Sequence, residues 1–128
     1  MMNSKEVALM FDLPIDTIRY YERVGVIPPI TRDKNGYRIY AKRDLNWIFL
    51  AKSLRKAGLS IESLIEFATL AQSKENVRAA QKQILQDQLT EINVKLEEMV
   101  RARDLLEYKI ETFDDHVAKI NAGELSDD

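Results

Sequence analysis

The chain has 128 residues, 45% of them apolar, which suffices for one or two small domains; it shows neither a run of about 18 apolar residues that could cross a membrane nor the basic and then apolar pattern of a signal peptide. Without these two features, we expect a cytoplasmic protein with no membrane partner. The absence of cysteine excludes disulfides, thiolate metal sites and thiol redox sensing, and the single histidine, His116, argues against a multi-histidine metal site, so we expect no metal or cofactor. Residues 1–60 hold 11 Lys and Arg against 6 Asp and Glu, whereas residues 61–128 hold 8 against 15, a distribution typical of a nucleic-acid-binding head on a solvated scaffold.

The first 25 residues predict two helices joined by a tight turn. Ser4 is suited to cap a helix that runs from Lys5 to about Phe11. Asp12, Leu13 and Pro14 form the turn, and Pro14 opens a second helix that runs to about Val24 and ends at Gly25. Helix, three-residue turn and helix together predict a helix-turn-helix.

A hairpin is predicted next, because two prolines exclude a helix at positions 28 and 29. Asn35 and Gly36 indicate a type I′ turn, since both central residues of that turn need positive φ. Residues 30–32 and 37–40 would be its two short strands. We call this predicted hairpin the wing.

Three more helical segments follow the wing. One is predicted from about Lys42 to Lys56, and another from Ser60, as its cap, to about Leu70. From residue 74 to residue 122 there is no Gly or Pro, and apolar residues recur at alternating steps of four and three, interrupted only by Arg103, which predicts one long coiled-coil helix. The alternative is a long helix that folds back on its own head. The residues of this stripe, which we expect to form a dimer interface, are Leu85, Leu89, Ile92, Leu96, Met99, Leu106, Ile110, Phe113, Val117 and Ile120.

The three predicted domains are therefore a DNA-binding head at residues 1–72, a dimerisation helix at residues 73–122 and an acidic tail at residues 123–128. In a helix-turn-helix, the first residues of the second helix reach base edges in the major groove, and Arg is suited to grip guanine with two donors. Residues of the wing and of the third helix would bind flanking phosphates. Each of these side chains, taken singly, is more often only a solvated or packing residue. The predicted DNA-binding residues are Asp16, Thr17, Arg19, Tyr20, Arg32, Lys34, Tyr37, Arg38, Tyr40 and Arg43.

Several motifs occur together in the order of a known family. They are Thr17-Ile18-Arg19-Tyr20-Tyr21-Glu22, Gly25-Val26-Ile27-Pro28, Arg32, Gly36-Tyr37-Arg38-Ile39-Tyr40, Asp44-Leu45 and Gly58-Leu59-Ser60. Over about residues 4–70 the chain resembles the DNA-binding head of MerR-family transcription regulators. The resemblance implies a mainly α fold, with a winged helix-turn-helix head, a two-stranded wing and a long C-terminal helix that pairs in an antiparallel coiled coil. It also implies a homodimer on a near-palindromic promoter operator, which bends and untwists an overlong spacer so that RNA polymerase engages both promoter elements.

The chain departs from the family at its sensing positions. It lacks the cysteines of the metal-sensing and electrophile-sensing branches, and only five residues follow Gly123, where the multidrug-sensing branch has a ligand domain. Two possibilities remain for the regulatory signal: a small effector that binds between the head and the dimer helix, or no effector. Aromatic residues could line such a space, although ordinary core packing is the favoured interpretation of Trp47, Phe49, Phe67 and Tyr108.

Two other functions stay open at this point. The head could serve a DNA-architectural or recombination-accessory protein, although the long helix argues against it, and the heptads alone would also suit a helical protein-binding adaptor. No enzyme is expected, because the sequence shows neither a nucleophile with a histidine partner nor a phosphate-binding glycine loop.

Overall fold

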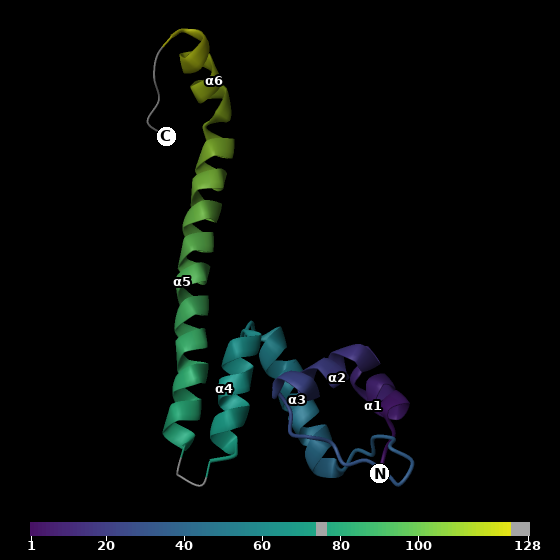
Figure 1. Ribbon diagram of the computed structural model, residues 1–128. Coiled ribbons are helices and arrows are strands. Elements are labelled where there is room, and N and C mark those ends of the chain that lie inside the picture. The colour runs from purple at the N-terminus through teal and green to yellow at the C-terminus, as the bar shows by residue number, and fades with distance from the viewer. Residues whose placement is uncertain (74–76, 124–128) are drawn as a thin grey trace. The chain divides into compact units, whose positions relative to one another are not determined.

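A computed structural model describes residues 1–73 and 77–123, and these residues form six α-helices (Figure 1). No helix in these ranges is long and apolar enough to cross a membrane. The predicted acidic tail lies, beyond Gly123, outside the described residues. The helices are α1 (Ser4–Phe11), α2 (Ile15–Val24), α3 (Lys42–Lys56), α4 (Ile61–Ala71), α5 (Arg78–Glu111) and α6 (Phe113–Asn121).

The chain divides into two compact units, Met1–Gln88 and Leu89–Asp128. The first unit extends beyond residue 72, where the sequence places the end of the head, because the first turns of α5 pack on it. Gln81 donates a hydrogen bond to the carbonyl of Phe67 at 3.2 Å, Gln88 donates one to Ala57 at 3.1 Å, and Ile84 packs against the core. The functional boundaries at residues 72 and 122 stay a prediction.

The helix-turn-helix is present where the sequence predicts it. Asp12 ends α1 in the left-handed region, at φ 52° and ψ 49°, and Leu13 donates a backbone hydrogen bond to Ala8 at 3.0 Å. Pro14 precedes the first residue of α2 in an extended conformation, and Gly25 ends that helix at φ 90°. An aspartate tolerates left-handed backbone better than most residues, so the turn forms without a glycine.

The cap of α1 differs from the prediction by one residue. Asn3, not Ser4, accepts a hydrogen bond from the backbone N–H of Glu6 at 2.9 Å, and the Glu6 carboxylate accepts one from the N–H of Asn3 at 3.0 Å. This reciprocal arrangement is a capping box, and the Asn3 amide oxygen supplies the acceptor that the serine was expected to supply. The predicted cap of α4 is confirmed, because Ser60 accepts from the N–H of Ser63 at 3.1 Å.

The wing is a hairpin loop without strands in the described part of the chain. An isolated antiparallel bridge joins Arg32 to Arg38, and the N–H of Asp33 donates to the carbonyl of Tyr37 at 2.8 Å. The predicted type I′ turn is wrong, since Asp12 is the only non-glycine residue with positive φ among those described, so Asn35 has an ordinary negative φ. Gly36, at φ 85°, is the only residue of the wing with a positive φ, as in a three-residue hairpin loop.

The core of the first unit is made by one face of each of its first four helices and by the segments between them. α1 contacts both α2 and α3, and α3 contacts α4. Burial of each large aliphatic side chain contributes about 1.5–3 kcal/mol to the stability of this unit. The buried apolar residues are Val7, Phe11, Ile18, Tyr21, Val26, Ile27, Ile30, Tyr40, Ile48, Ala51, Leu59, Leu64 and Ala68.

The predicted single helix over residues 73–122 is two helices, α5 and α6, that meet at Thr112. Thr112 departs from helical geometry, with φ −102° and ψ 12°, and its hydroxyl donates to the carbonyl of Tyr108 at 2.8 Å. Hydrogen bonding of a threonine to the carbonyl four residues back competes with the helical ladder and bends helices. His116, which is buried, has its Nδ1 3.4 Å from the same hydroxyl.

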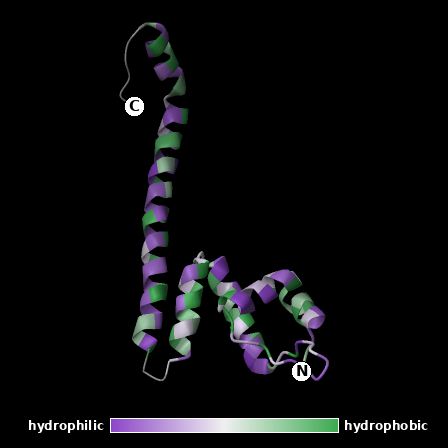
Figure 2. Ribbon diagram, in the orientation of Figure 1, coloured by the Kyte–Doolittle hydropathy of each residue, from purple (hydrophilic) through white to green (hydrophobic). Residues whose placement is uncertain are grey.

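Apolar and polar residues alternate along α5 (Figure 2). Nine of the ten stripe residues are exposed and Ile92 is half-buried. These exposed aliphatic side chains give α5 an apolar surface.

Candidate nucleic-acid interface

A groove in the first unit is bordered by three segments: the start of α1, the start of α2, and the wing. Four of its lining side chains are basic, namely Lys5, Arg19, Arg32 and Arg38. The backbone brings α1 to the wing, because Met2 and Tyr40 exchange hydrogen bonds of 3.1 and 2.8 Å. A concave surface with four cations concentrates positive potential where a phosphate chain could lie.

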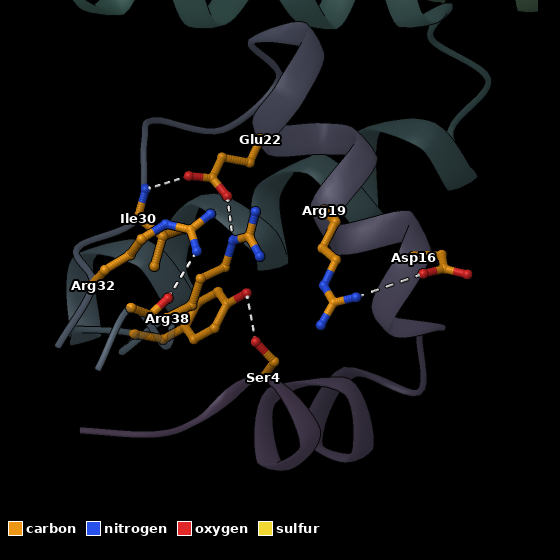
Figure 3. Close-up of polar contacts among 9 residues, drawn as sticks. Ser4, Asp16, Arg19, Glu22, Ile30, Arg32 and Arg38 are labelled. Atoms are coloured by element: carbon orange, nitrogen blue, oxygen red, sulfur yellow. Dashed lines mark hydrogen bonds and ion pairs between the residues drawn. The ribbon is translucent and has the colours of Figure 1, made fainter. Parts of the chain in front are cut away.

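Arg19 projects from α2 toward this groove (Figure 3). Its side chain is 48% exposed, and its Nη1 lies 4.0 Å from the carboxylate of Asp16, which is 98% exposed. An exposed pair at that distance contributes at most about 1 kcal/mol. The guanidinium of Arg19 is therefore available to a ligand in the groove.

The wing presents its side chains on a loop that its own hydrogen bonds hold. The Asp33 carboxylate accepts from the N–H groups of Asn35 at 2.9 Å and Tyr37 at 3.0 Å, and Arg32 donates from Nη1 to the carbonyl of Gly36 at 2.8 Å. Tyr37 is 71% exposed and lines the groove. The hydroxyl of an exposed tyrosine can donate to a phosphate oxygen.

Glu22 joins α2 to the two ends of the wing (Figure 3). Its Oε2 accepts from the backbone N–H of Ile30 at 2.8 Å, and its Oε1 accepts from Nε of Arg38 at 2.7 Å. The two side chains of this ion pair are only 15% and 19% exposed. A charge-assisted bond of this length with limited solvent access is stronger than a surface ion pair.

The other predicted DNA-binding residues take different positions. Tyr40 is 1% exposed and its hydroxyl lies 3.3 Å from Ser4 Oγ, so it is a core residue. Tyr20 is half-buried beneath Arg23, whose guanidinium carbon lies 5.3 Å from the ring centroid. Thr17 is half-buried in α2, and Lys34 and Arg43 are exposed but do not line the groove.

Sequence reasoning missed the contribution of α1 to the groove. Asn3, Ser4 and Lys5 line it together with Ile15. A lysine at the start of a helix is an unremarkable feature of a sequence. Only the pairing of Met2 with Tyr40, 38 positions away in the chain, shows that this lysine lies near the wing.

The four aromatic residues considered for an effector site are divided between the two units. Trp47 and Phe67 line an apolar gap of about 10 Å³ in the head, roughly the volume of one water probe. Phe49 is 63% exposed on α3, and Tyr108 belongs to the other unit. Within residues 1–73 and 77–123, no group of three or more acidic or histidine side chains could hold a metal ion.

Comparison with known proteins identifies the family. Residues 2–69 match the family model described as MerR HTH family regulatory protein. The chain is 37% identical to the transcriptional regulator HmrR of Rhizobium leguminosarum over 109 residues, which cover 85% of this chain and 84% of that protein. The chain belongs to the MerR family of DNA-binding transcription regulators. The resemblance drawn from its motifs is thereby confirmed.

A second MerR-type relative is the transcriptional regulator AdhR of Bacillus subtilis. It is 48% identical over 87 residues, which cover 68% of this chain and 62% of AdhR, so the match spans less than two thirds of that relative's length.

Solved structures of the MerR family share the fold. A protein from Listeria monocytogenes, described as a MerR family transcriptional regulator, has a TM-score of 0.75 and 37% identity, over 96% of this chain and 93% of its own. HiNmlR, described as a MerR family regulator lacking the sensor domain and bound to promoter DNA, has a TM-score of 0.69 and 25% identity, over 91% and 92% of the two chains. The mainly helical architecture with a long C-terminal helix is therefore that of MerR regulators.

Proposed function

We propose that this protein is a homodimeric transcription regulator that binds a near-palindromic operator within a promoter. The basic groove between α1, α2 and the wing carries this proposal. It joins cations from three separate segments, Lys5, Arg19 and the two wing arginines, on one concave surface next to the helix-turn-helix. Its residues would hold the phosphate chain, while the first turn of α2 would reach base edges.

Residues outside the groove extend this surface. Thr17 lies in the first turn of α2, Lys34 lies on the wing, and Arg43 lies at the start of α3. Asp16 lies in the same turn as Thr17, but we leave it out of the interface because its exposed carboxylate would repel phosphates. The hydroxyl of Tyr20 would donate a hydrogen bond to a flanking phosphate. We leave Tyr40 out of the interface, because its ring is enclosed by the core.

The apolar stripe along α5 and α6 supports the proposed homodimer. The stripe residues of α5 and α6 are aliphatic or aromatic and nearly all exposed, and a second copy of the same stripe is the simplest surface that would cover them. We propose the antiparallel arrangement of the coiled coil that the family resemblance implies. Two heads on one dimer would then contact two operator half-sites.

Regulation through DNA shape follows from this arrangement. A dimer that holds two half-sites can stabilise a bent and untwisted spacer, which brings the promoter elements into register for RNA polymerase. HiNmlR, described as bound to promoter DNA, supports the promoter as the target. A non-enzymatic, cytoplasmic role fits these partners, and a response to a small-molecule effector stays a prediction.

Selection of bound genomic fragments by the purified protein, followed by footprinting, tests the function. We expect protection of an inverted repeat inside an unusually long promoter spacer. Transcription from that promoter should change when the protein is added. Protection without a repeat, spread along any DNA, would instead indicate an architectural protein, and no binding to any fragment at physiological salt would indicate a protein-binding adaptor.

Arg19→Ala tests the groove directly. We expect about a tenfold loss of operator affinity, because a cation at the start of α2 contacts a base or a phosphate. Dimerisation and thermal stability should stay near those of the wild type. Fluorescence anisotropy with a labelled operator measures the affinity.

The matched control for Arg19→Ala is Arg23→Ala on the same helix. Arg23 is exposed but does not line the groove. Its loss should lower affinity much less than the loss of Arg19. Equal affinities of the wild type and Arg19→Ala would refute the role of Arg19.

A further inference from the structure

One carboxylate links the helix-turn-helix to the wing at both of its ends. Glu22 on α2 accepts from the N–H of Ile30, at the start of the wing, and from Nε of Arg38, near its end, at 2.8 and 2.7 Å. One carboxylate oxygen of Glu22 thus binds the backbone at the start of the wing, and the other binds a side chain near its end. Since Glu22 is 15% exposed, solvent competes little for either bond.

The contact also selects which edge of the Arg38 guanidinium is left for a ligand. A guanidinium has five donors in a rigid plane. Its Nε–H is used by Glu22, and among the described residues no hydrogen-bond partner is present for its two Nη groups. Arg38 lines the basic groove, so the Nη edge is the one that can bind a phosphate with two parallel bonds.

We propose that Glu22 is a positioning residue for DNA binding: it holds the wing against α2 and orients Arg38 so that the Nη edge of the guanidinium grips a backbone phosphate of the operator. This inference rests on the proposed function, since it needs DNA in the groove. Glu22 itself touches no DNA. Its contribution passes through the orientation of Arg38 and the placement of the wing.

The proposal predicts an effect opposite in sign to simple electrostatics. A carboxylate beside a DNA-binding surface repels phosphates, so its neutralisation should tighten binding if charge alone matters. If Glu22 positions Arg38, its neutralisation should weaken operator binding. The sign of the change therefore separates the two roles.

The experiment compares Glu22→Gln with Asp16→Asn by anisotropy on the selected operator and on a scrambled duplex. Both variants remove one negative charge from α2 next to an arginine, but Asp16 is 98% exposed and 4.0 Å from Arg19. We expect Glu22→Gln to lose about tenfold in operator affinity, the size of one charge-assisted hydrogen bond, and to bind scrambled DNA at least as well as the wild type. Asp16→Asn should bind the operator as well as the wild type or better.

A second pair of variants separates positioning from folding. Arg38→Lys keeps the charge but lacks the planar fork, and we expect it to weaken operator binding about as much as Glu22→Gln does. When Glu22→Gln is added to Arg38→Lys, the operator affinity should fall by less than a further twofold. Thermal melting and circular dichroism identify any variant that is not folded at the assay temperature. If Glu22→Gln is not folded, the operator affinity of Arg38→Lys decides whether the inference holds.

Two results overturn the inference while the proposed function stands. One is a Glu22→Gln protein that binds the operator as tightly as Asp16→Asn does. The other is an Arg38→Lys protein with wild-type affinity. A wild-type protein that selects no operator removes both the inference and the function on which it rests.

Discussion

At the scale of single residues, polar side chains set the geometry of this protein at a few positions. The carboxylate of Asp33 holds the wing turn through two backbone N–H groups, and that of Glu22 holds the wing against α2. Asp44 accepts from the N–H of Ala41 at 2.9 Å and so caps α3 from within. Each of these acids satisfies backbone donors that would otherwise need water.

Within residues 1–73 and 77–123, Asp12 is the only non-glycine residue with a positive φ, at 52°. We expect Asp12→Val to lower the free energy of unfolding by about 1–2 kcal/mol, because a β-branched residue is strained in the left-handed region. Asp12→Gly should leave stability unchanged or raise it. Chemical denaturation of the three proteins measures this, and equal stability of the valine and glycine variants would show that the turn does not need left-handed backbone at this position.

At the scale of secondary structure, caps and breaks decide where the helices end. α1 begins at a capping box, α2 ends at a glycine, and α4 begins at a serine cap. The break between α5 and α6 has no Gly or Pro, and the backbone bonds of Thr112 to Tyr108 and of His116 to Thr112, at 2.9 and 3.0 Å, continue across it. The backbone of Thr112 is therefore hydrogen-bonded to both helices, although its dihedral angles are not helical.

The capping box of α1 can be tested with two substitutions. Asn3→Ala removes the side-chain acceptor for the Glu6 N–H, and we expect a loss of about 1 kcal/mol. In a domain of this size that loss corresponds to a fall in Tm of roughly 4–8 °C. Asn3→Asp keeps an acceptor and should melt close to the wild type, whereas a similar fall for both variants would point to a role of Asn3 other than capping.

At the scale of the whole molecule, the two units carry different parts of the proposed function. The first has a core closed by four helices and a basic groove on its surface. The second has almost no core of its own, since His116 is its only buried side chain in the part that the structure describes, and its apolar side chains are exposed. Association with a second copy, as we propose, would cover these side chains and stabilise this segment.

Leu96→Lys tests association through the stripe. Leu96 is 52% exposed, and a lysine there would place a charge in the centre of the proposed dimer interface. We expect the dimer dissociation constant to rise about 100-fold or more, since two leucine contacts are lost per dimer. Sedimentation velocity measures the change, and operator affinity should fall with it because the two heads no longer bind as one unit.

The control for Leu96→Lys is Thr90→Lys, which adds the same charge one residue after Leu89 and so about 100° around the helix from it. This variant should remain dimeric. Dissociation of both variants would show that added charge, rather than the stripe, controls assembly.

Much of this protein follows from local sequence. The limits of α2, α3 and α4, the glycine end of α2, the turn at Asp12 and the family itself could be predicted, because caps, turns and helical periodicity depend on residues within one or two turns of each other. The wing strands, the cap of α1 and the continuity of the last helix were predicted less well. Each depends on a specific hydrogen bond, such as those from the N–H of Glu6 to Asn3 and from the Thr112 hydroxyl to Tyr108, that a residue pattern does not reveal.

The composition of the candidate site was decided by tertiary structure. The bridge between Met2 and Tyr40 brings Lys5 to the groove and encloses the ring of Tyr40 in the core, and Glu22 meets Arg38 across 16 positions of sequence. Tyr37 and Tyr40 look equivalent in the sequence, yet one is 71% and the other 1% exposed. Long-range packing decides which side chains become surface and which become core, whereas the sequence by itself determined the helices that present them.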